Sequence, residues 1–253
     1  MQNIGENEEE NQNPYLQQNI IDTSLFLKRV QKKFKNLLSI IKPTTHNCAD
    51  LFVDSEFARF ICNTVGYDLV SSSNCMFVNT DNEEIIENYV PSNGDILVFF
   101  VNDEESSYET VSKILEKLGK LVLRFPLNLV SVPKRSLRHY LLLEKYSLVK
   151  YFSSINSFDF NFGFIPLQED VLSLERKSDD REILLKSSFN CIDLYVDELI
   201  KLKYVIGSCP THFSKGDFAS DVLQRLKEKE SLEKLETKYN PGNLPIKKFR
   251  FES

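Results

Sequence analysis

The sequence contains few side chains of the types that hold metal ions. There are three His and five Cys residues, and only two short pairs place these types near each other: His46-x-Cys48 and Cys209-x-x-His212. A zinc site needs three or four convergent ligands, and each pair supplies two. The two pairs could meet in space, but a buried Cys beside a surface His is the simpler interpretation of each. We therefore expect no metal site.

Residues for nucleophilic or acid–base catalysis are equally sparse. No G-x-S-x-G motif is present, so no Ser lies in a nucleophile elbow. His139 falls inside a predicted helix beside Arg138, and we expect it to be a surface residue or a satisfied one. The Asp179-Asp180 pair lies in a predicted solvated loop, without the burial that raises a carboxyl pKa. We expect no catalytic residues, although an enzyme whose site is dispersed along the chain remains an alternative.

The sequence also contains no phosphate-binding loop motif. The chain has eight Gly and neither G-x-G-x-x-G nor G-x-x-x-x-G-K-[ST]. Ser214-Lys215-Gly216-Asp217 superficially resembles a phosphate loop, but it lacks the spaced glycines whose N–H groups would surround a phosphate. Asn93-Gly94 precedes a predicted strand and indicates a turn. These observations predict no bound nucleotide and no other cofactor.

Composition limits the class of protein. The 253 residues suffice for one large domain or two small ones, with 42% hydrophobic and 27% charged residues. A formal net charge of −6 argues against general nucleic-acid binding, which needs clustered Lys and Arg. The scattered Cys residues favour a reducing, cytoplasmic environment. No signal peptide and no apolar run of about 18 residues is visible, so we expect membrane contact only through partners.

The N-terminal region divides into two parts. Residues 1–17 are rich in Glu, Asn and Gln and predict disorder. An amphipathic helix follows, from about Thr23 to Ile41, with apolar residues at helical spacing. Five basic residues lie between the apolar ones: Lys28, Arg29, Lys32, Lys33 and Lys35. They could contact acidic lipid or a partner, but a solvated helix face is the simpler interpretation.

Strands and helices then alternate along the chain. Apolar runs predict strands at 50–54, 75–78, 95–102 and 127–132, and periodic segments predict helices at 56–64, 83–89, 106–118 and from Pro133 to about Lys145. Within the run at 95–102, Ile96–Val101 is continuously apolar, as expected for a strand covered on both faces. The alternation predicts an α/β fold with a parallel, doubly wound sheet.

The pattern changes after Tyr151. We predict strands at 158–167 and 171–175, a loop at 178–180, and helices at 189–206 and 213–236. This arrangement predicts an α/β domain over residues 18–150, followed by the incomplete start of a second α/β domain over 151–253.

Six segments in the second half carry a family resemblance in their order. They are Val132–Leu137 (VPKRSL), Phe164–Leu167 (FIPL), Asp170–Glu175 (DVLSLE), Tyr204–Pro210 (YVIGSCP), Phe213–Ala219 (FSKGDFA) and Val222–Lys227 (VLQRLK). The ordered set resembles the Sec-one/Munc-eighteen-like (SM) family, and within it the branch of vacuolar protein sorting-associated protein thirty-three. The resemblance covers most of residues 50–230. Ser214 departs from the pattern, since the family has Gly there.

The resemblance implies a binding protein of the membrane-fusion machinery and not an enzyme. SM proteins form an arch that cradles SNARE helices and promotes vesicle docking and fusion. The implied partners are syntaxin-like SNARE proteins and subunits of the HOPS and CORVET tethers, in endosomal, vacuolar or lysosomal transport. SM proteins are much longer than this chain, so we expect the SNARE-gripping third domain and the end of the second domain to be absent.

The candidate binding residues are few. Lys134 and Arg135 lie where a predicted strand ends and a helix begins, the usual crevice position in doubly wound folds. Lys215 and Asp217 are further candidates, although helix capping alone would explain Asp217. Two alternatives to the SM interpretation remain. One is a small enzyme of nucleotide-binding or flavodoxin-like type, which would need a pocket at the carboxyl ends of the strands. The other is a shortened paralogue that binds a tether subunit without promoting fusion.

Overall fold

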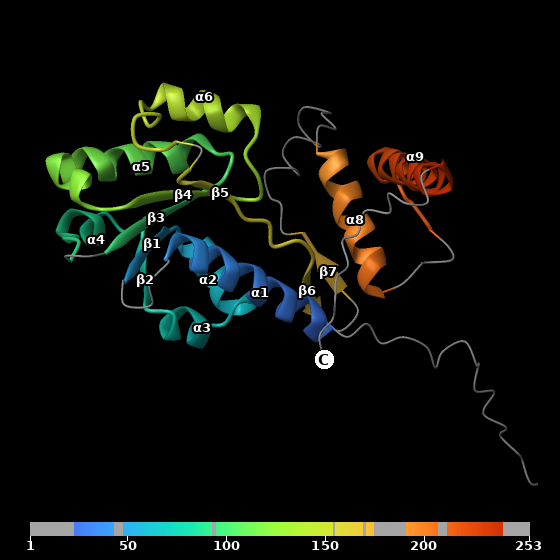
Figure 1. Ribbon diagram of the computed structural model, residues 1–253, viewed down its shortest axis with the longest axis horizontal. Helices are drawn as coiled ribbons and strands as arrows, with labels where there is room; N and C mark the ends of the chain where they lie inside the picture. The colour runs from blue at the N-terminus through green and yellow to red at the C-terminus, as the bar shows by residue number, and fades with distance from the viewer. Residues whose placement is uncertain are drawn as a thin grey trace, which may run out of the picture.

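Five parallel strands form the centre of the computed structural model (Figure 1), which describes residues 23–42, 48–92, 95–153, 155–168, 171–174, 191–206 and 212–239. The strands are β1 (Ala49–Val53), β2 (Cys75–Asn79), β3 (Ile96–Val101), β4 (Leu127–Ser131) and β5 (Ser157–Asp159). Their order across the sheet is β2-β1-β3-β4-β5, and every neighbouring pair is parallel. Every residue of β1 and β3 is buried, and β3 is apolar at every position, as expected for a strand covered on both faces.

Helices cover both faces of this sheet. The helical elements are α1 (Thr23–Ile41), α2 (Ser55–Thr64), α3 (Tyr67–Ser72), α4 (Glu83–Asn88), α5 (Glu105–Leu118), η1 (Gly119–Arg124) and α6 (Leu137–Lys145). In Figure 1, α1, α2 and α3 lie below the sheet and α5 and α6 lie above it. Side chains alternate between the faces, so that Leu51 and Val98 pack with α1–α3, while Phe52 and Phe99 pack with α5 and α6. The sheet is therefore doubly wound, and the predicted α/β fold class is confirmed.

The chain then leaves the sheet and forms a smaller layer. Strands β6 (Ile165–Gln168) and β7 (Val171–Ser173) pair antiparallel. Helices α8 (Ile192–Ile206) and α9 (Asp217–Tyr239) pack together around Val196, Val222 and Leu226. Among the described helices, none combines the length and the apolar character that crossing a bilayer requires.

The predicted helix start at Pro133 is wrong. Helix α6 begins four residues later, at Leu137, because the Ser136 side chain accepts a hydrogen bond from the His139 backbone and caps the helix. Pro133 follows a cis peptide bond in the loop between β4 and α6. The short helices α3 and η1 were not predicted, since neither carries a helical apolar period long enough to recognise.

The single strand predicted at 158–167 is also wrong, because the segment divides between two sheets. Its first residues form β5, which pairs with β4, and its last residues enter the β6–β7 hairpin. Gly163, with φ of 73°, lies in the turn between them. The first sheet thus extends past residue 150, and the division into domains at 18–150 and 151–253 stays a prediction. The predicted disorder at 1–17, the turn at 93–94 and the loop at 178–180 lie outside the described residues.

Candidate functional site

A pocket lies at the carboxyl ends of the strands. The chain runs from β1 to β2 on one side of the sheet and from β3 to β4 and β5 on the other, so the topology switches between β1 and β3. Ligands bind open α/β sheets in the crevice at such a switch point. The pocket has a volume of about 230 Å³, and segments after β1, β3, β4 and β5 line it together with part of α8.

Aromatic rings and carboxylates dominate the lining of this pocket. Phe57, Phe60 and Phe162 pack against one another, with edge-to-face contacts from Phe162 to both neighbours. The charged lining residues are Asp54, Glu56, Glu104 and Glu198, and the described lining includes no Lys or Arg. Such a surface suits a ligand that combines apolar and cationic groups better than one that carries phosphate.

Asp54 has a structural role at the edge of the pocket. Its carboxylate accepts a hydrogen bond of 2.6 Å from the Phe57 backbone N–H and caps α2. Burial raises the pKa of Asp54 above its ordinary value, and repulsion from Asp81 and Glu56 adds to the rise, whereas the hydrogen bond from Phe57 opposes it. A cation bound in the pocket would relieve this repulsion.

Glu198 lies in the pocket wall opposite Asp54, and its contacts connect three elements of the fold. Its buried carboxylate accepts a hydrogen bond of 3.0 Å from Asn161 Nδ2 and one from Lys201 Nζ. The Asn161 carbonyl oxygen accepts a hydrogen bond of 3.0 Å from Lys33 Nζ. These contacts connect α1, the β5–β6 turn and α8, and they leave little space beside Gly163, where an added Cβ would lie 2.8 Å from Glu198 Oε2.

This close approach predicts the effect of substituting Gly163. Gly163→Ala should lower the free energy of unfolding by about 1–2 kcal/mol from its positive φ alone, and by more because the methyl group meets Glu198. Gly216→Ala is the matched control, since Gly216 also has a positive φ but has open space around it. Urea denaturation of both variants measures the difference. Equal losses would show that Glu198 does not pack against the turn.

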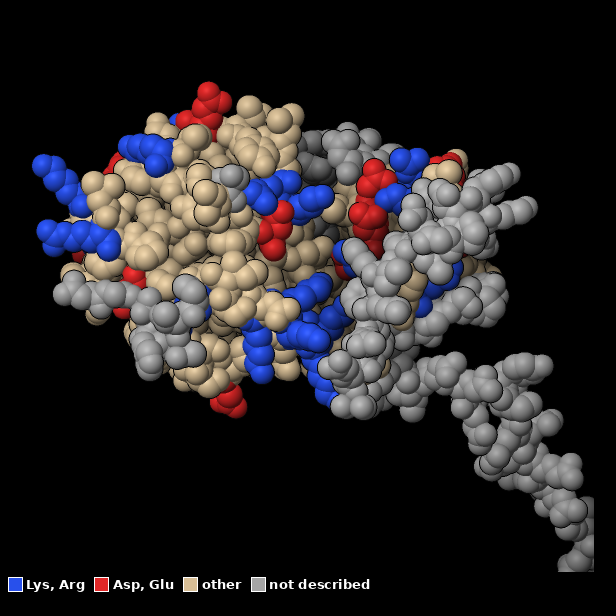
Figure 2. Space-filling model, viewed as in Figure 1, with Lys and Arg blue, Asp and Glu red and all other residues tan. Residues whose placement is uncertain are grey.

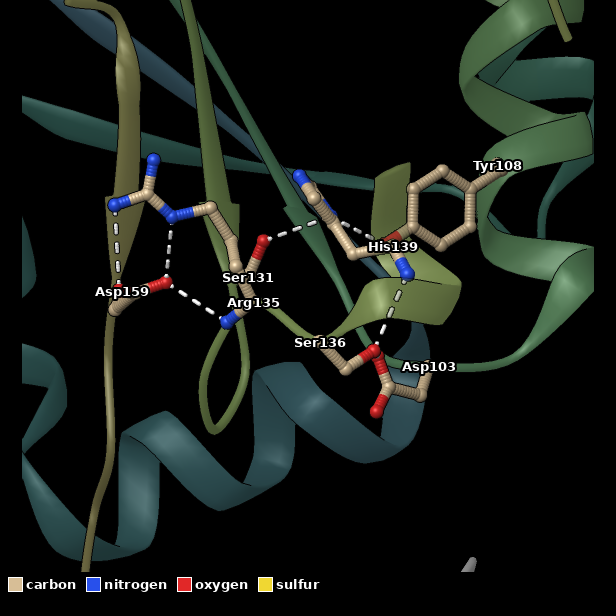
Figure 3. Close-up of polar contacts among 7 residues, drawn as sticks. All are labelled: Asp103, Tyr108, Ser131, Arg135, Ser136, His139 and Asp159. Atoms are coloured by element: carbon tan, nitrogen blue, oxygen red, sulfur yellow. Dashed lines mark hydrogen bonds and ion pairs between the residues drawn. The ribbon is translucent and has the colours of Figure 1, made fainter. Parts of the chain in front are cut away.

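Arg135 is held in an ion pair with Asp159, as Figure 3 shows. The distance between Arg135 Nε and Asp159 Oδ1 is 2.9 Å, and that between Nη2 and Oδ2 is 3.3 Å. The Arg135 backbone N–H also donates to Oδ1, at 2.9 Å. The hydrogen bonds to Asp159 raise the pKa of Arg135. Arg135 therefore fastens the β4–α6 loop to β5, while the neighbouring Lys134 is exposed.

The sequence interpretation missed the environment of His139. The side chain is buried, with Nδ1 lying 2.7 Å from the Tyr108 hydroxyl and 3.1 Å from Ser131 Oγ (Figure 3). Its Nε2 is also buried, without a hydrogen-bond partner in the part of the chain that the structure describes. Burial, with repulsion from Arg135, lowers the pKa of His139 to about 4. His139 therefore acts as a neutral link between α5, β4 and α6.

The outer side of α6 carries an exposed apolar strip. Leu137, Tyr140 and Leu141 are 78%, 55% and 57% exposed, and their i, i+3, i+4 spacing places them on one side of the helix. We call these three residues the α6 face. Exposed Lys134 precedes the strip, and exposed Arg138 flanks it. The buried His139 network lies on the opposite side of the helix and fixes the direction of the α6 face.

The four predicted binding residues fall into two separate places. Lys134 and Arg135 lie between β4 and α6, whereas Lys215 and Asp217 lie exposed at the start of α9. Within the described residues, no hydrogen bond or ion pair links Lys134 or Arg135 to Lys215 or Asp217. Within the same ranges, no three His, Cys, Asp or Glu side chains lie close enough to hold a metal ion. His46 and Cys209 fall outside these ranges.

Comparison with known proteins gives structural matches only. No protein-family model matches the sequence, and no curated protein matches it. The SM protein Vps45 superposes with a TM-score of 0.52 at 11% identity, over 83% of this chain and 38% of Vps45. Vps45 in complex with the Qa SNARE Tlg2 gives 0.54 at 10% identity, over 83% and 36% of the two chains.

A third structure, the Unc18–syntaxin 1 complex from Monosiga brevicollis, gives a TM-score of 0.52 at 16% identity, over 86% of this chain and 37% of the matched one. The chain thus spans less than two fifths of the length of these structures. At such low identity the likeness concerns the backbone arrangement. The chain has the mixed α/β fold, built on a five-stranded parallel sheet, that is found in SM proteins.

Proposed function

We propose that this protein binds SNARE proteins in vesicle docking and fusion, as an SM-type binding protein without catalytic activity. The supporting observation is its structural likeness to SM proteins, two of which were solved in complex with syntaxin 1 and with the Qa SNARE Tlg2. The ordered sequence segments from Val132 to Lys227 point to the same family independently of the backbone comparison.

The α6 face is the surface that we propose for this contact. SNARE proteins present amphipathic helices, and an exposed apolar strip at i, i+3, i+4 spacing can pack against the apolar side of such a helix. Lys134 beside the strip would add a charge contact to an acidic residue of the partner. Arg135 would act indirectly, because its ion pair with Asp159 positions the loop that carries Lys134.

The finer assignment is also part of the proposal. It includes HOPS and CORVET tether subunits as partners, and a peripheral location on endosomal, vacuolar or lysosomal membranes. Lys215 and Asp217 form a second proposed contact surface at the start of α9, where both are exposed.

A pull-down with cytosolic regions of SNARE proteins and with tether subunits tests the function. The double variant Leu137→Ser/Leu141→Ser should weaken SNARE binding about 10-fold or more, because each substitution removes an apolar side chain from the contact. Ile155→Ser is the matched control, since Ile155 is exposed and apolar but lies outside α6. Equal binding by wild type and double variant would remove α6 from the site, and binding to no SNARE would contradict the function.

The pocket at the switch point supports a second candidate function, which is binding of a small ligand. Its position is that of ligand sites in doubly wound sheets, and its four carboxylates favour a cationic ligand. Thermal-shift measurements with alkylamines and with nucleotides distinguish the two chemistries. A shift with amines would support the pocket, whereas nucleotide turnover would favour the enzyme alternative.

A further inference from the structure

Helix α1 concentrates positive charge in a chain that is acidic overall. It contains five Lys or Arg residues and no Asp or Glu, whereas the whole chain has a formal net charge of −6. Such segregation produces a local positive potential that net charge conceals. In Figure 2, Lys and Arg side chains gather over α1, in the lower centre of the view.

Packing fixes which side of α1 carries this charge. Phe26, Val30, Phe34 and Leu37 are buried, and most of them join the core below the sheet. Lys28, Lys32 and Lys35 are exposed on the opposite side, and their i, i+4, i+7 spacing forms a row along the helix. Within the part of the chain that the structure describes, none of these three lysines forms an ion pair. We call them the α1 lysine row.

Additional cations lie beside this row. Lys33 is near Arg29 on α1 and near Lys201 on α8, and Glu198 is the acidic group that faces it. Burial lowers the pKa of Lys33; Glu198 opposes this decrease, and repulsion from Arg29 and Lys201 reinforces it. Lys33, Arg29 and Lys201 thus lie near one carboxylate, and they add to the positive potential beside the α1 lysine row.

We propose that α1 binds an anionic membrane surface directly, through lipid head groups contacted by the α1 lysine row. This goes beyond the function proposed above, in which the partners are SNARE proteins and tether subunits. The row lies on the exposed side of a single helix, away from the described lining of the switch-point pocket, so its three lysines can contact an extended plane of negative charge together. Leu25 and Ile40, exposed near the two ends of α1, can enter the interfacial layer.

Lipid chemistry favours this occupant over an acidic protein helix. Lysines are flexible point charges that attract many phosphate and carboxylate groups without a fixed pairing geometry. An acidic helix would be expected to pack against an apolar strip between the charges, whereas the centre of this surface contains Lys32 and Asn36. Clustered Lys and Arg on an amphipathic helix are the common feature of segments that bind anionic leaflets.

Co-sedimentation with vesicles tests the proposal. The protein should bind vesicles that contain phosphatidylserine but not vesicles of phosphatidylcholine alone, and rising salt should weaken binding. Lys28→Gln/Lys32→Gln/Lys35→Gln should weaken binding about 100-fold, on the order of five-fold for each lysine. Leu25→Ser/Ile40→Ser should weaken binding to a smaller degree. Circular dichroism confirms that each variant is folded.

The control removes the same charge elsewhere. Lys120→Gln/Lys150→Gln/Lys227→Gln changes three exposed lysines outside α1 and should retain wild-type binding. Equal weakening of both triple variants would overturn the proposal, because net charge and not α1 would then govern binding. Capture by an immobilised acidic helical peptide, without sedimentation on phosphatidylserine vesicles, would also overturn it and assign α1 to a protein partner. The vesicles contain no SNARE, so either failure leaves the proposed SNARE binding untouched.

Discussion

Phe34→Ala should lower the free energy of unfolding by about 3–5 kcal/mol, the cost of removing a fully buried ring from a packed core. Phe34 has no exposed surface and contacts Phe160 edge to face, with 5.7 Å between ring centroids. Phe160 belongs to the segment between β5 and β6, which lies more than a hundred residues away in the sequence. The substitution therefore opens a cavity where α1, the sheet and this segment meet.

The comparison with Ile40→Ala makes this result specific. Ile40 is an apolar residue of the same helix, but it is 63% exposed, so its substitution should change stability by less than about 0.5 kcal/mol. Chemical denaturation followed by circular dichroism measures both variants. If Phe34→Ala were as mild as Ile40→Ala, α1 would not be docked on the sheet, and the fixed direction of the α1 lysine row would lose its basis.

His139 should make stability depend on pH between about 6.5 and 4. Its pKa falls from an ordinary value of 6.5 to about 4 in the folded protein. Below pH 6.5, His139 binds a proton in the unfolded chain but stays neutral in the folded protein until the pH approaches 4. The free energy of unfolding therefore decreases as pH falls. The loss is about 1.4 kcal/mol for each pH unit and reaches about 3 kcal/mol near pH 4. Above pH 6.5 both states are neutral at this residue, and the contribution is complete.

His139→Gln isolates this contribution, because Gln does not titrate and can still meet the Tyr108 hydroxyl. The difference in stability between wild type and variant should change by about 3 kcal/mol from pH 7 to pH 4, whatever its value at pH 7. Groups that face His139 remain in both proteins: Arg135, Asp159, Tyr108 and Ser131. His212→Gln is the control for the loss of an imidazole, since His212 is exposed and lies outside the His139 network. A pH-independent difference for His139→Gln would mean that His139 is solvated.

Phe34 and His139 both anchor elements that present the proposed surfaces. Phe34 fixes the side of α1 that carries the lysine row, and His139 fixes the side of α6 that carries Leu137, Tyr140 and Leu141. A variant that loosens either anchor without touching the exposed residues should also weaken binding through that surface. Binding should be measured at pH 7, where His139 is neutral in both the folded and the unfolded wild type. At this pH the titration of His139 does not contribute to the difference between wild type and His139→Gln, which separates recognition from pH-dependent stability.

Local periodicity was enough to predict most of the first sheet. Runs such as Ile96–Val101 are apolar at every position, as expected for a strand covered on both faces, and the structure confirms four predicted strands within two residues. The spacing in α1 likewise identified its buried and basic sides from the sequence. These features depend on neighbours within a few residues, and the sequence records them directly.

Contacts between distant residues could not be predicted in the same way. An apolar run shows that a strand is covered but not which strand lies beside it, so the order β2-β1-β3-β4-β5 and the pocket at its switch point emerge only in the folded chain. The ion pair of Arg135 with Asp159 arises from the pairing of β5 with β4, and the burial of His139 arises from the packing of α6 against α5 and β4.

Local patterning therefore specifies an α/β fold with a basic first helix. Long-range packing specifies which candidate residues are anchors, as with Arg135, and which are exposed, as with Lys134. The two residues are adjacent and of similar charge, so no difference in their local pattern distinguishes them. Their environments differ because Asp159, on strand β5, pairs with Arg135 and not with Lys134. A side chain's environment depends on such contacts between residues that are distant in the sequence.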